Sequence, residues 1–335
     1  MKPHCGRKVL AAACLAAFCK VGIAQVSPAT ILKIDIQNFV QYHHDEPSYA
    51  KLAASVEATA APPAPNFAHS ILVADIVAVN GRPARGTHVC RLQQVNMTTD
   101  PTPGQAIGDV RFPALLDCME HVLQADGTWV GAFTFIGRAT GPPPPGAPLE
   151  QPFGGTVVTG GNGAFLGVRG QGGEVRFAPG ARRASVTEDP SRRRFHGGGN
   201  VTLIFHLIPM FRPEIVMAGS GPAVVHSSDF SLVGASKPAR SGEILTLFAS
   251  GLGPTRPGVD PGQPFTADPV QIVNSPVELT VNGKPADVLY AGGYPGAVDR
   301  YQVNFRVPDG TAAGLAAVLL TSAWITGPEV RIAVE

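Results

Sequence analysis

Apolar and polar residues alternate along many short segments of the chain, which is the pattern of half-buried β-strands. Residues 31–42 show it clearly, with Ile34, Ile36, Asn38 and Val40 on one side of the segment. Glycine- and proline-containing turns separate such segments, so short strands are expected throughout the N-terminal half. Its other predicted strands are residues 71–79, 87–96, 114–123, 129–137, 156–159, 168–177 and 200–208.

The C-terminal half has short strands at regular spacing. Asn282-Gly283 and residues 308–310 are turn signals between them. Because no long amphipathic helix is predicted anywhere after the N-terminal segment, the fold class is expected to be all-β, with a β-sandwich in this half. The predicted strands are residues 243–249, 277–281, 287–290, 301–307, 317–321 and 330–334.

Length and composition predict two such domains. A chain of 335 residues exceeds what one hydrophobic core usually holds. Its 39 glycines and 32 prolines favour turns over helices. Residues 25–208 and 223–335 are therefore assigned to two domains, with residues 209–222 as a linker. The formal net charge of +1 argues against nucleic acid as a partner.

Residues 1–24 have the features of a secretory signal peptide. A basic start precedes the apolar residues 9–19, and Gly22 and Ala24 are small residues before a mature start at Gln25. The apolar run is too short to cross a bilayer, so no stable membrane span is expected. The protein is predicted to be secreted, periplasmic or located at the cell surface.

Two cysteines, Cys90 and Cys118, remain once this segment is removed, in a compartment where disulfides persist. They bracket a loop centred on Gly104, so a hairpin there would place them opposite each other. A cross-strand disulfide, worth about 2–4 kcal/mol, is favoured. The alternative is two buried thiols, one of them facing the interior.

The same hairpin register pairs His88 with Glu120. A histidine beside a carboxylate inside a barrel could act as an acid–base couple in proton transfer. A hydrogen-bonded polar pair near the rim, without a catalytic role, is the favoured interpretation. A shift of the register by one residue would separate the two side chains.

Other polar clusters are interpreted without a chemical role. Residues 43–46, His-His-Asp-Glu, are adjacent, whereas metal ligands normally come from separate elements, so a solvated turn is favoured. No metal site and no other cofactor is expected. The arginines within residues 182–194 are interpreted as a solvated loop. His226 and Asp229 have no partner that the sequence suggests.

Residues 160–167 are glycine-rich and invite comparison with phosphate-binding loops. No Lys-Ser or Lys-Thr follows them, and further glycines leave no room for a helix, so a turn between strands is favoured.

Over residues 159–171 the pattern T-G-G-x-G-x-F-x-G-x-x-G-Q resembles the allene oxide cyclase and dirigent barrel superfamily. The signature residues are Gly160, Gly161, Gly163, Phe165, Gly167 and Gly170.

This resemblance covers residues 31–208 and implies an eight-stranded antiparallel barrel. In that superfamily the central cavity holds apolar, lipid-like or phenolic molecules. Pro47 matches the family's active-site proline and Cys90 a cavity cysteine, but the family's acidic residue falls on Asn38. A neutral amide cannot replace a carboxylate that stabilises positive charge, so cyclase activity is not expected. The candidate cavity-lining residues are Asn38, Pro47, His88, Cys90 and Glu120.

The C-terminal half is similar to a domain of exported acidobacterial proteins that is related to the immunoglobulin-like IPT/TIG fold. The matching segments are residues 238–243, 250–255, 292–296 and 301–305. Such domains serve as spacers, stabilisers or interaction modules, so this resemblance says little about activity.

Three functions remain open. The leading hypothesis is a non-catalytic exported protein whose barrel binds a small apolar or phenolic ligand. A cyclase, isomerase or dirigent-like enzyme acting in the barrel lumen is the second, and a structural or cell-surface interaction protein is the third. A monomer and the trimer implied by the resemblance both remain open.

Overall fold

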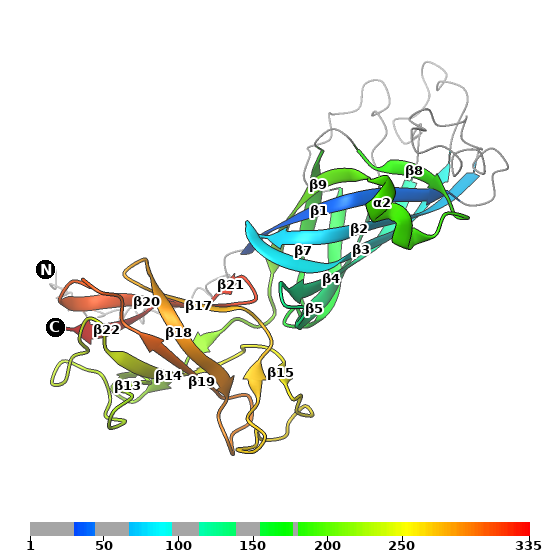
Figure 1. Cartoon of the computed structure of the whole chain (residues 1–335). Helices are drawn as coiled ribbons and strands as arrows, with labels where there is room; N and C mark the ends of the chain where they lie inside the picture. The colour runs from blue at the N-terminus through cyan, green and yellow to red at the C-terminus, as the bar shows by residue number, and fades with distance from the viewer. Residues whose placement is uncertain (1–29, 44–66, 96–113, 139–154, 177–179) are drawn as a thin grey trace, which may run out of the picture.

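The computed structural model describes residues 30–43, 67–95, 114–138, 155–176 and 180–335 (Figure 1). The expected signal peptide, residues 44–46 and the candidate Pro47 lie outside the described residues. The elements are almost all β-strands, arranged in two bodies (Figure 1). Among the helices of the described ranges, none is long and apolar enough to cross a membrane.

The N-terminal body is a closed antiparallel barrel. Each strand pairs with its neighbour in the order β2-β3-β4-β5-β6-β7-β9-β1, and pairing of β1 with β2 closes the ring. The all-β class and the eight-stranded barrel expected from the sequence are therefore confirmed. Its strands are β1 (Thr30–His43), β2 (Phe67–Val79), β3 (Arg82–Val95), β4 (Ala114–Gln124), β5 (Trp129–Arg138), β6 (Thr156–Gly163), β7 (Arg169–Arg176) and β9 (Gly199–Ile208).

Alternation of side chains builds the core inside the barrel. On β1, Leu32, Ile34 and Ile36 are fully buried, while the residues between them lie on the outer face. A bulge then shifts the register between Ile36 and Phe39, so that Phe39 rejoins the inner cluster. Burial of each such side chain contributes about 1.5–3 kcal/mol. The interior is therefore the main source of the barrel's stability.

Residues 182–198 lie against the outside of the barrel. β8 (Arg182–Ser185) pairs in parallel with the end of β1, and η1 (Pro190–Arg192) leads into α2 (Arg193–His196). We expected the arginines here to be solvated, and for two of them this was wrong. The Arg182 guanidinium binds the Glu188 carboxylate at 2.6 Å, with side chains only 13% and 7% exposed, and Arg193 binds Asp75. The Arg182–Glu188 pair lies within this segment, whereas the Arg193–Asp75 pair attaches the segment to β2 of the barrel.

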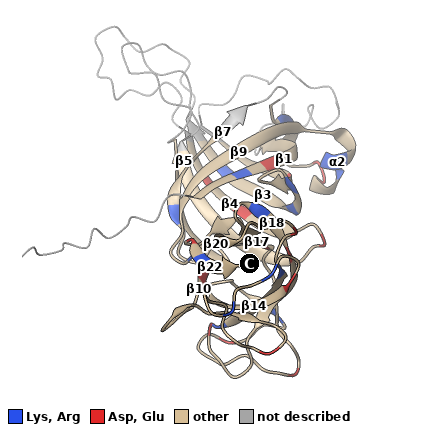
Figure 2. Cartoon of the chain, turned by 90° about the vertical axis from the view of Figure 1, so that its left-hand side faces the viewer, with Lys and Arg blue, Asp and Glu red and all other residues tan. Residues whose placement is uncertain are grey.

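Asp75 attaches α2 to the barrel, and the basic residues of α2 lie beside β1 in Figure 2. Its carboxylate accepts hydrogen bonds from the guanidinium groups of Arg193 and Arg194 and from the Asn38 amide. Burial acts to raise the pKa of this carboxyl, but the hydrogen bonds from Arg194, Asn38 and Arg193 outweigh it and lower the pKa to about 2. The ionised carboxylate is thus part of the folded structure.

The second body is one curled sheet whose halves share β18 and enclose a separate apolar core. β18 pairs with β19 in one half and with β17 in the other, and the core takes Leu247 and Phe305 from the first half and Leu279 and Leu320 from the second. This is the two-layer arrangement that the strand spacing predicted. The strands are β10 (Glu214–Ile215), β13 (Val224–His226), β14 (Ile244–Ser250), β15 (Thr255–Arg256), β16 (Ile272–Val273), β17 (Val277–Val281), β18 (Lys284–Gly293), β19 (Tyr301–Arg306), β20 (Gly314–Ser322), β21 (Ile325–Thr326) and β22 (Val330–Val334).

The predicted linker, residues 209–222, is partly integrated into this second body. β10 pairs with β14 of the second sheet, and β11 (Met217–Ala218) pairs with β12 (Gly221–Pro222). The segment is therefore not a free tether. Its short strands carry too few residues for a periodic pattern to identify them.

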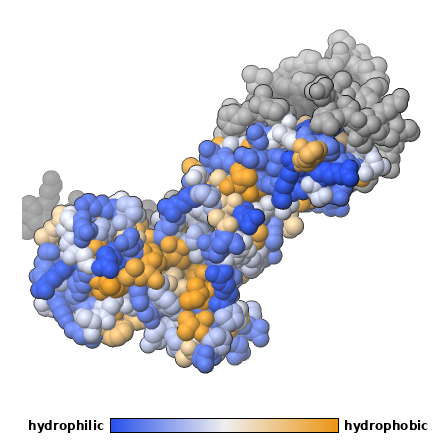
Figure 3. All heavy atoms as spheres, in the orientation of Figure 1, coloured by the Kyte–Doolittle hydropathy of each residue, from blue (hydrophilic) through white to orange (hydrophobic). Residues whose placement is uncertain are grey.

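The two bodies meet at the end of the barrel that holds its tight turns (Figures 1 and 3). Gly253 approaches the turn after β6 so closely that a Cβ added to it would lie 3.3 Å from the Ala164 Cβ. Arg82, at the start of β3, forms an ion pair of 2.5 Å with Glu278 of β17. The C-terminal body therefore covers this end of the barrel.

Asp75 is predicted to make the protein sensitive to acid. Since its pKa falls from the usual 3.8 to about 2 on folding, its contribution is full above pH 4 and is lost as pH falls toward 2. The loss amounts to about 2 kcal/mol. Urea unfolding between pH 2 and 5 should show this step in the wild type and a flatter dependence in Asp75→Asn. Identical pH dependence of the two proteins would contradict the assignment.

Candidate functional site

His88 and Glu120 form a polar contact inside the barrel, which corrects our expectation that the pair lies near the rim. They are Cα partners on β3 and β4, and His88 Nδ1 lies 2.5 Å from Glu120 Oε1. The two residues are 3% and 0% exposed. The register predicted from the position of the loop at Gly104 is thus the one observed. A buried polar pair of this kind is held in a low-dielectric environment, where its hydrogen bond is strong.

Cys90 and Cys118 form a disulfide one layer further along the same strand pair. The favoured expectation is confirmed, and the alternative of two thiols does not apply. His88 Nε2 lies 3.2 Å from Cys90 Sγ. Because a disulfide sulfur has no hydrogen to donate, Nε2 must carry the proton if this contact is a hydrogen bond. Both nitrogens of the imidazole are therefore in contact with protein atoms.

Aromatic rings surround the pair. The His88 ring lies 5.6 Å from the Phe39 ring and 6.4 Å from that of Phe135, measured between centroids. The rings of Phe133 and Phe135 each contact that of Phe205, at 5.0 and 5.1 Å. Each of these contacts joins strands that are not neighbours in the barrel, so the rings meet across the interior. The interior around the His88–Glu120 pair is therefore lined by aromatic rings.

One carboxylate oxygen of Glu120 has no hydrogen-bond donor in the part of this apolar environment that the structure describes. Oε2 is buried and has no hydrogen-bond partner among the described residues. An unsatisfied buried acceptor costs about 1–3 kcal/mol, and more when it carries charge. An oxygen of this kind therefore has a strong preference for any donor that enters the lumen, whether water or a ligand hydroxyl.

Asn38 does not join the lumen residues, which corrects our expectation that it lines a cavity. Its φ of +54° places it in the bulge of β1, and its amide donates to Asp75 Oδ2 at 2.9 Å. Asp75 alternates with the core residues Ala74 and Ile76 and faces α2 outside the barrel. A sequence pattern cannot locate a bulge, and the bulge reverses the direction of the side chain.

The glycine signature covers the end of β6, the turn after it and the start of β7, without any phosphate-loop geometry. β6 runs on through Gly163, which extends the predicted strand, and Phe165 is buried beneath the turn. A Cβ at Gly161 would lie 2.5 Å from the Phe165 carbonyl oxygen, and one at Gly170 would lie 2.0 Å from that of His206. These glycines are required because backbones approach closely there. The signature is structural in this chain.

Within the described part of the chain, no group of three or more His, Cys, Asp or Glu side chains is placed to hold a metal ion. His43 is the one residue of the 43–46 cluster that the structure describes, and it is buried. Burial, with some repulsion from Arg183, lowers its pKa to about 4, so this imidazole is neutral at pH 7.

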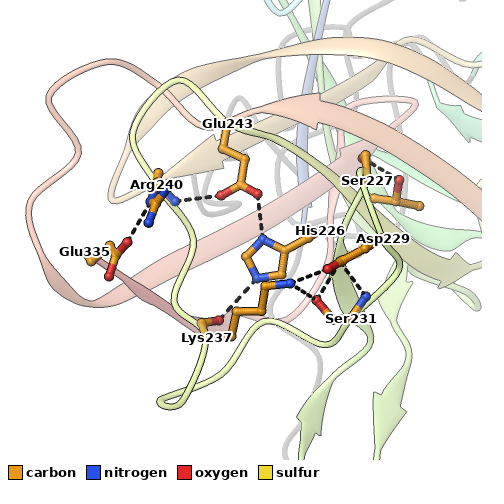
Figure 4. A network of polar contacts seen from close by, with 9 residues as sticks. His226, Ser227, Asp229, Ser231, Lys237, Arg240, Glu243 and Glu335 are labelled. Carbon is orange, nitrogen blue, oxygen red and sulfur yellow. Dashed lines mark hydrogen bonds and ion pairs between the residues drawn. The ribbon is translucent and has the colours of Figure 1, made fainter.

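A polar network in the second body was missed by sequence reasoning (Figure 4). His226 Nδ1 lies 2.6 Å from Glu243 Oε1, and its Nε2 lies 3.2 Å from the Lys237 carbonyl oxygen. Asp229 binds the Lys237 ammonium and Ser231, and these hydrogen bonds hold the pKa of its carboxyl well below the usual range. With both ring nitrogens occupied, His226 fastens the loop after β13 and is not available to a substrate.

Removal of the disulfide is predicted to destabilise the barrel. For a sequence separation of 28 residues, chain entropy gives a loss of about 3–4 kcal/mol in the double variant Cys90→Ala, Cys118→Ala. Denaturant unfolding of this variant should match that of the reduced wild type. Equal stability of the oxidised wild type and the variant would show that the bond contributes nothing.

Comparisons of this chain with protein-family models, with curated proteins and with solved structures find no match. The resemblances to the allene oxide cyclase and dirigent barrels and to the IPT/TIG-like domains therefore stay predictions. The case for a function depends on the geometry of the lumen.

Proposed function

We propose that this is an exported, non-catalytic binding protein whose barrel holds a small apolar molecule bearing a hydroxyl group, of the phenolic kind. The observation that carries the proposal is the unpartnered Oε2 of Glu120, which is fully buried in a lumen lined largely by apolar side chains. A ligand hydroxyl would donate to this oxygen while its hydrocarbon part contacts the surrounding side chains.

The inner face near Glu120 suits such a molecule. Leu72, Leu92 and Leu116 belong to or pack against the inner cluster on the side of the disulfide. On the same side of the inner face, the Gln41 amide donates a hydrogen bond to the Ser70 hydroxyl, so these two polar side chains are partners of each other. Satisfying this buried acceptor removes a cost of about 1–3 kcal/mol, which is roughly a 5- to 150-fold preference for a phenol over the matching hydrocarbon.

The geometry of His88 favours binding over catalysis. A general base must reach the proton that it abstracts, through a free nitrogen. Nδ1 faces Glu120 and Nε2 faces the Cys90 sulfur, so neither nitrogen is free for a substrate. The disulfide also removes both thiols as nucleophiles.

A lumen enzyme using the His88–Glu120 couple is the second candidate, because their 2.5 Å contact would allow proton transfer.

The proposal of export draws on the sequence and on the disulfide. A buried cross-strand disulfide persists in oxidising compartments, which fits the predicted signal peptide. Phenolic and lipid-like molecules partition poorly into water, and a protein that carries them outside the cytoplasm would need an apolar interior of this kind.

Binding of 1-naphthol and of naphthalene to the purified protein tests the proposal. The wild type should bind 1-naphthol about tenfold or more tightly than naphthalene, because only the naphthol donates to Oε2. Glu120→Leu should abolish this difference, since it removes the acceptor and keeps an apolar side chain of similar length. Isothermal titration calorimetry provides both affinities.

Asp117→Asn is the matched control, because Asp117 is on the same strand but its side chain is 46% exposed and pairs with Arg91 outside the barrel. It should bind like the wild type. The proposal fails if the wild type retains neither compound, or if Glu120→Leu keeps the full preference for 1-naphthol. Turnover of a phenolic substrate that His88→Gln abolishes would instead support the enzyme.

A further inference from the structure

A hairpin of the second body enters the barrel end. Ser322 pairs with Ile325, so Ala323 and Trp324 form the two-residue turn between β20 and β21. All three of Ala323, Trp324 and Ile325 are buried, at 1%, 8% and 2% exposure. They belong to the apolar cluster of the barrel and not to the core of their own body. The turn thus completes the barrel core.

The backbone of this turn is unusual for its residues. Ala323 and Trp324 have φ of +49° and +63°, the left-handed conformation of a type I′ hairpin turn. The turns at Asn80-Gly81 and Asn282-Gly283 have the same signs of φ and use the dipeptide that this turn favours. Alanine and tryptophan are strained there, because the Cβ crowds the following carbonyl. Strain of this kind persists where surrounding contacts impose it, and here the indole is held inside the barrel.

Polar contacts also join the second body to the barrel. A buried aromatic side chain combined with such contacts is typical of an interface hot spot. The contacts join Arg82 to Glu278, the Gln124 amide to the Asn274 carbonyl oxygen, and the Arg256 guanidinium to the Thr128 hydroxyl. These polar contacts and the buried indole of Trp324 together attach the second body to the barrel.

Trp324 also brings an unsatisfied donor to the barrel. Its indole Nε1 is buried and has no hydrogen-bond partner among the described residues. Buried indole N–H groups normally have an acceptor. Glu120 Oε2 is likewise a buried acceptor without a donor among the described residues. An occupant of the lumen that reaches either group, water or ligand, would satisfy it.

We infer that the C-terminal body is the floor of the barrel's binding site, anchored by Trp324, and that a ligand is held in the lumen only while this floor is in place. The coupling to a ligand rests on the proposed function, whereas the role of Trp324 as the anchor of the floor does not. A domain of this kind is a component of the site and not a spacer.

Trp324→Gly tests the inference in the full chain. Glycine relieves the strain of the turn, so any loss of stability reports the missing indole. Urea unfolding followed by circular dichroism should give one transition for the wild type. In the variant the barrel should unfold separately, with its midpoint lowered by about 1 M or more. Its affinity for 1-naphthol should fall at least tenfold.

Ala323→Gly is the matched control, because it relieves strain in the same turn and keeps the indole. It should unfold and bind like the wild type. Trp324→Phe retains an aromatic anchor and should shift the barrel midpoint in the same direction by less, so this variant decides the question if Trp324→Gly does not fold.

The outcomes separate the claims. An unchanged barrel midpoint in both Trp324 variants overturns the anchor. A lowered midpoint with unchanged 1-naphthol affinity overturns the coupling of floor to ligand. If the wild type binds no 1-naphthol while the Trp324 variants still lower the midpoint of barrel unfolding, the proposed function fails. The role of Trp324 as the anchor of the C-terminal body on the barrel is then still supported.

Discussion

Burial of one face of every barrel strand is the constraint on which the rest of this structure depends. Because side chains alternate across a strand, a register that places Leu32, Ile34 and Ile36 inside also fixes the partners of each strand. On β3 and β4 the same rule brings a disulfide, a histidine and a carboxylate into the apolar interior. The chemistry of the lumen thus follows from packing. A polar group that water would satisfy at the surface costs free energy when it is buried without a partner, so it favours a ligand that supplies one.

Much of this fold could be predicted from the sequence, because its determinants are local. The alternation along residues 31–42 and the near-symmetric spacing of Cys90 and Cys118 around their loop predict the strand and the disulfide that the structure shows. What escaped prediction depends on distant or irregular contacts. Asp75 and Arg193 are 118 residues apart, and the bulge at Asn38 leaves no mark in a period-two pattern. Pairing of His88 with Glu120 was predictable, whereas the unpartnered Oε2 was not, since it depends on every neighbour at once.

The turn at Ala323 and Trp324 also depends on a distant contact that the sequence does not reveal. Local propensity places Asn-Gly in a type I′ turn, and the chain does so twice, at residues 80–81 and 282–283. Its third example breaks the rule because the tryptophan is buried in another body. A departure from local preference therefore marks the contact that joins the two halves of the molecule, and it gives the C-terminal body a structural part in the lumen that its sequence did not indicate.

A crystal structure of the full chain grown with 1-naphthol tests the central claim most directly. The account predicts the naphthol rings inside the barrel, above a floor that includes Trp324, with the hydroxyl oxygen within hydrogen-bond distance, about 2.5–3.0 Å, of Glu120 Oε2. A lumen occupied by protein side chains alone, or a naphthol bound elsewhere on the molecule, would contradict it.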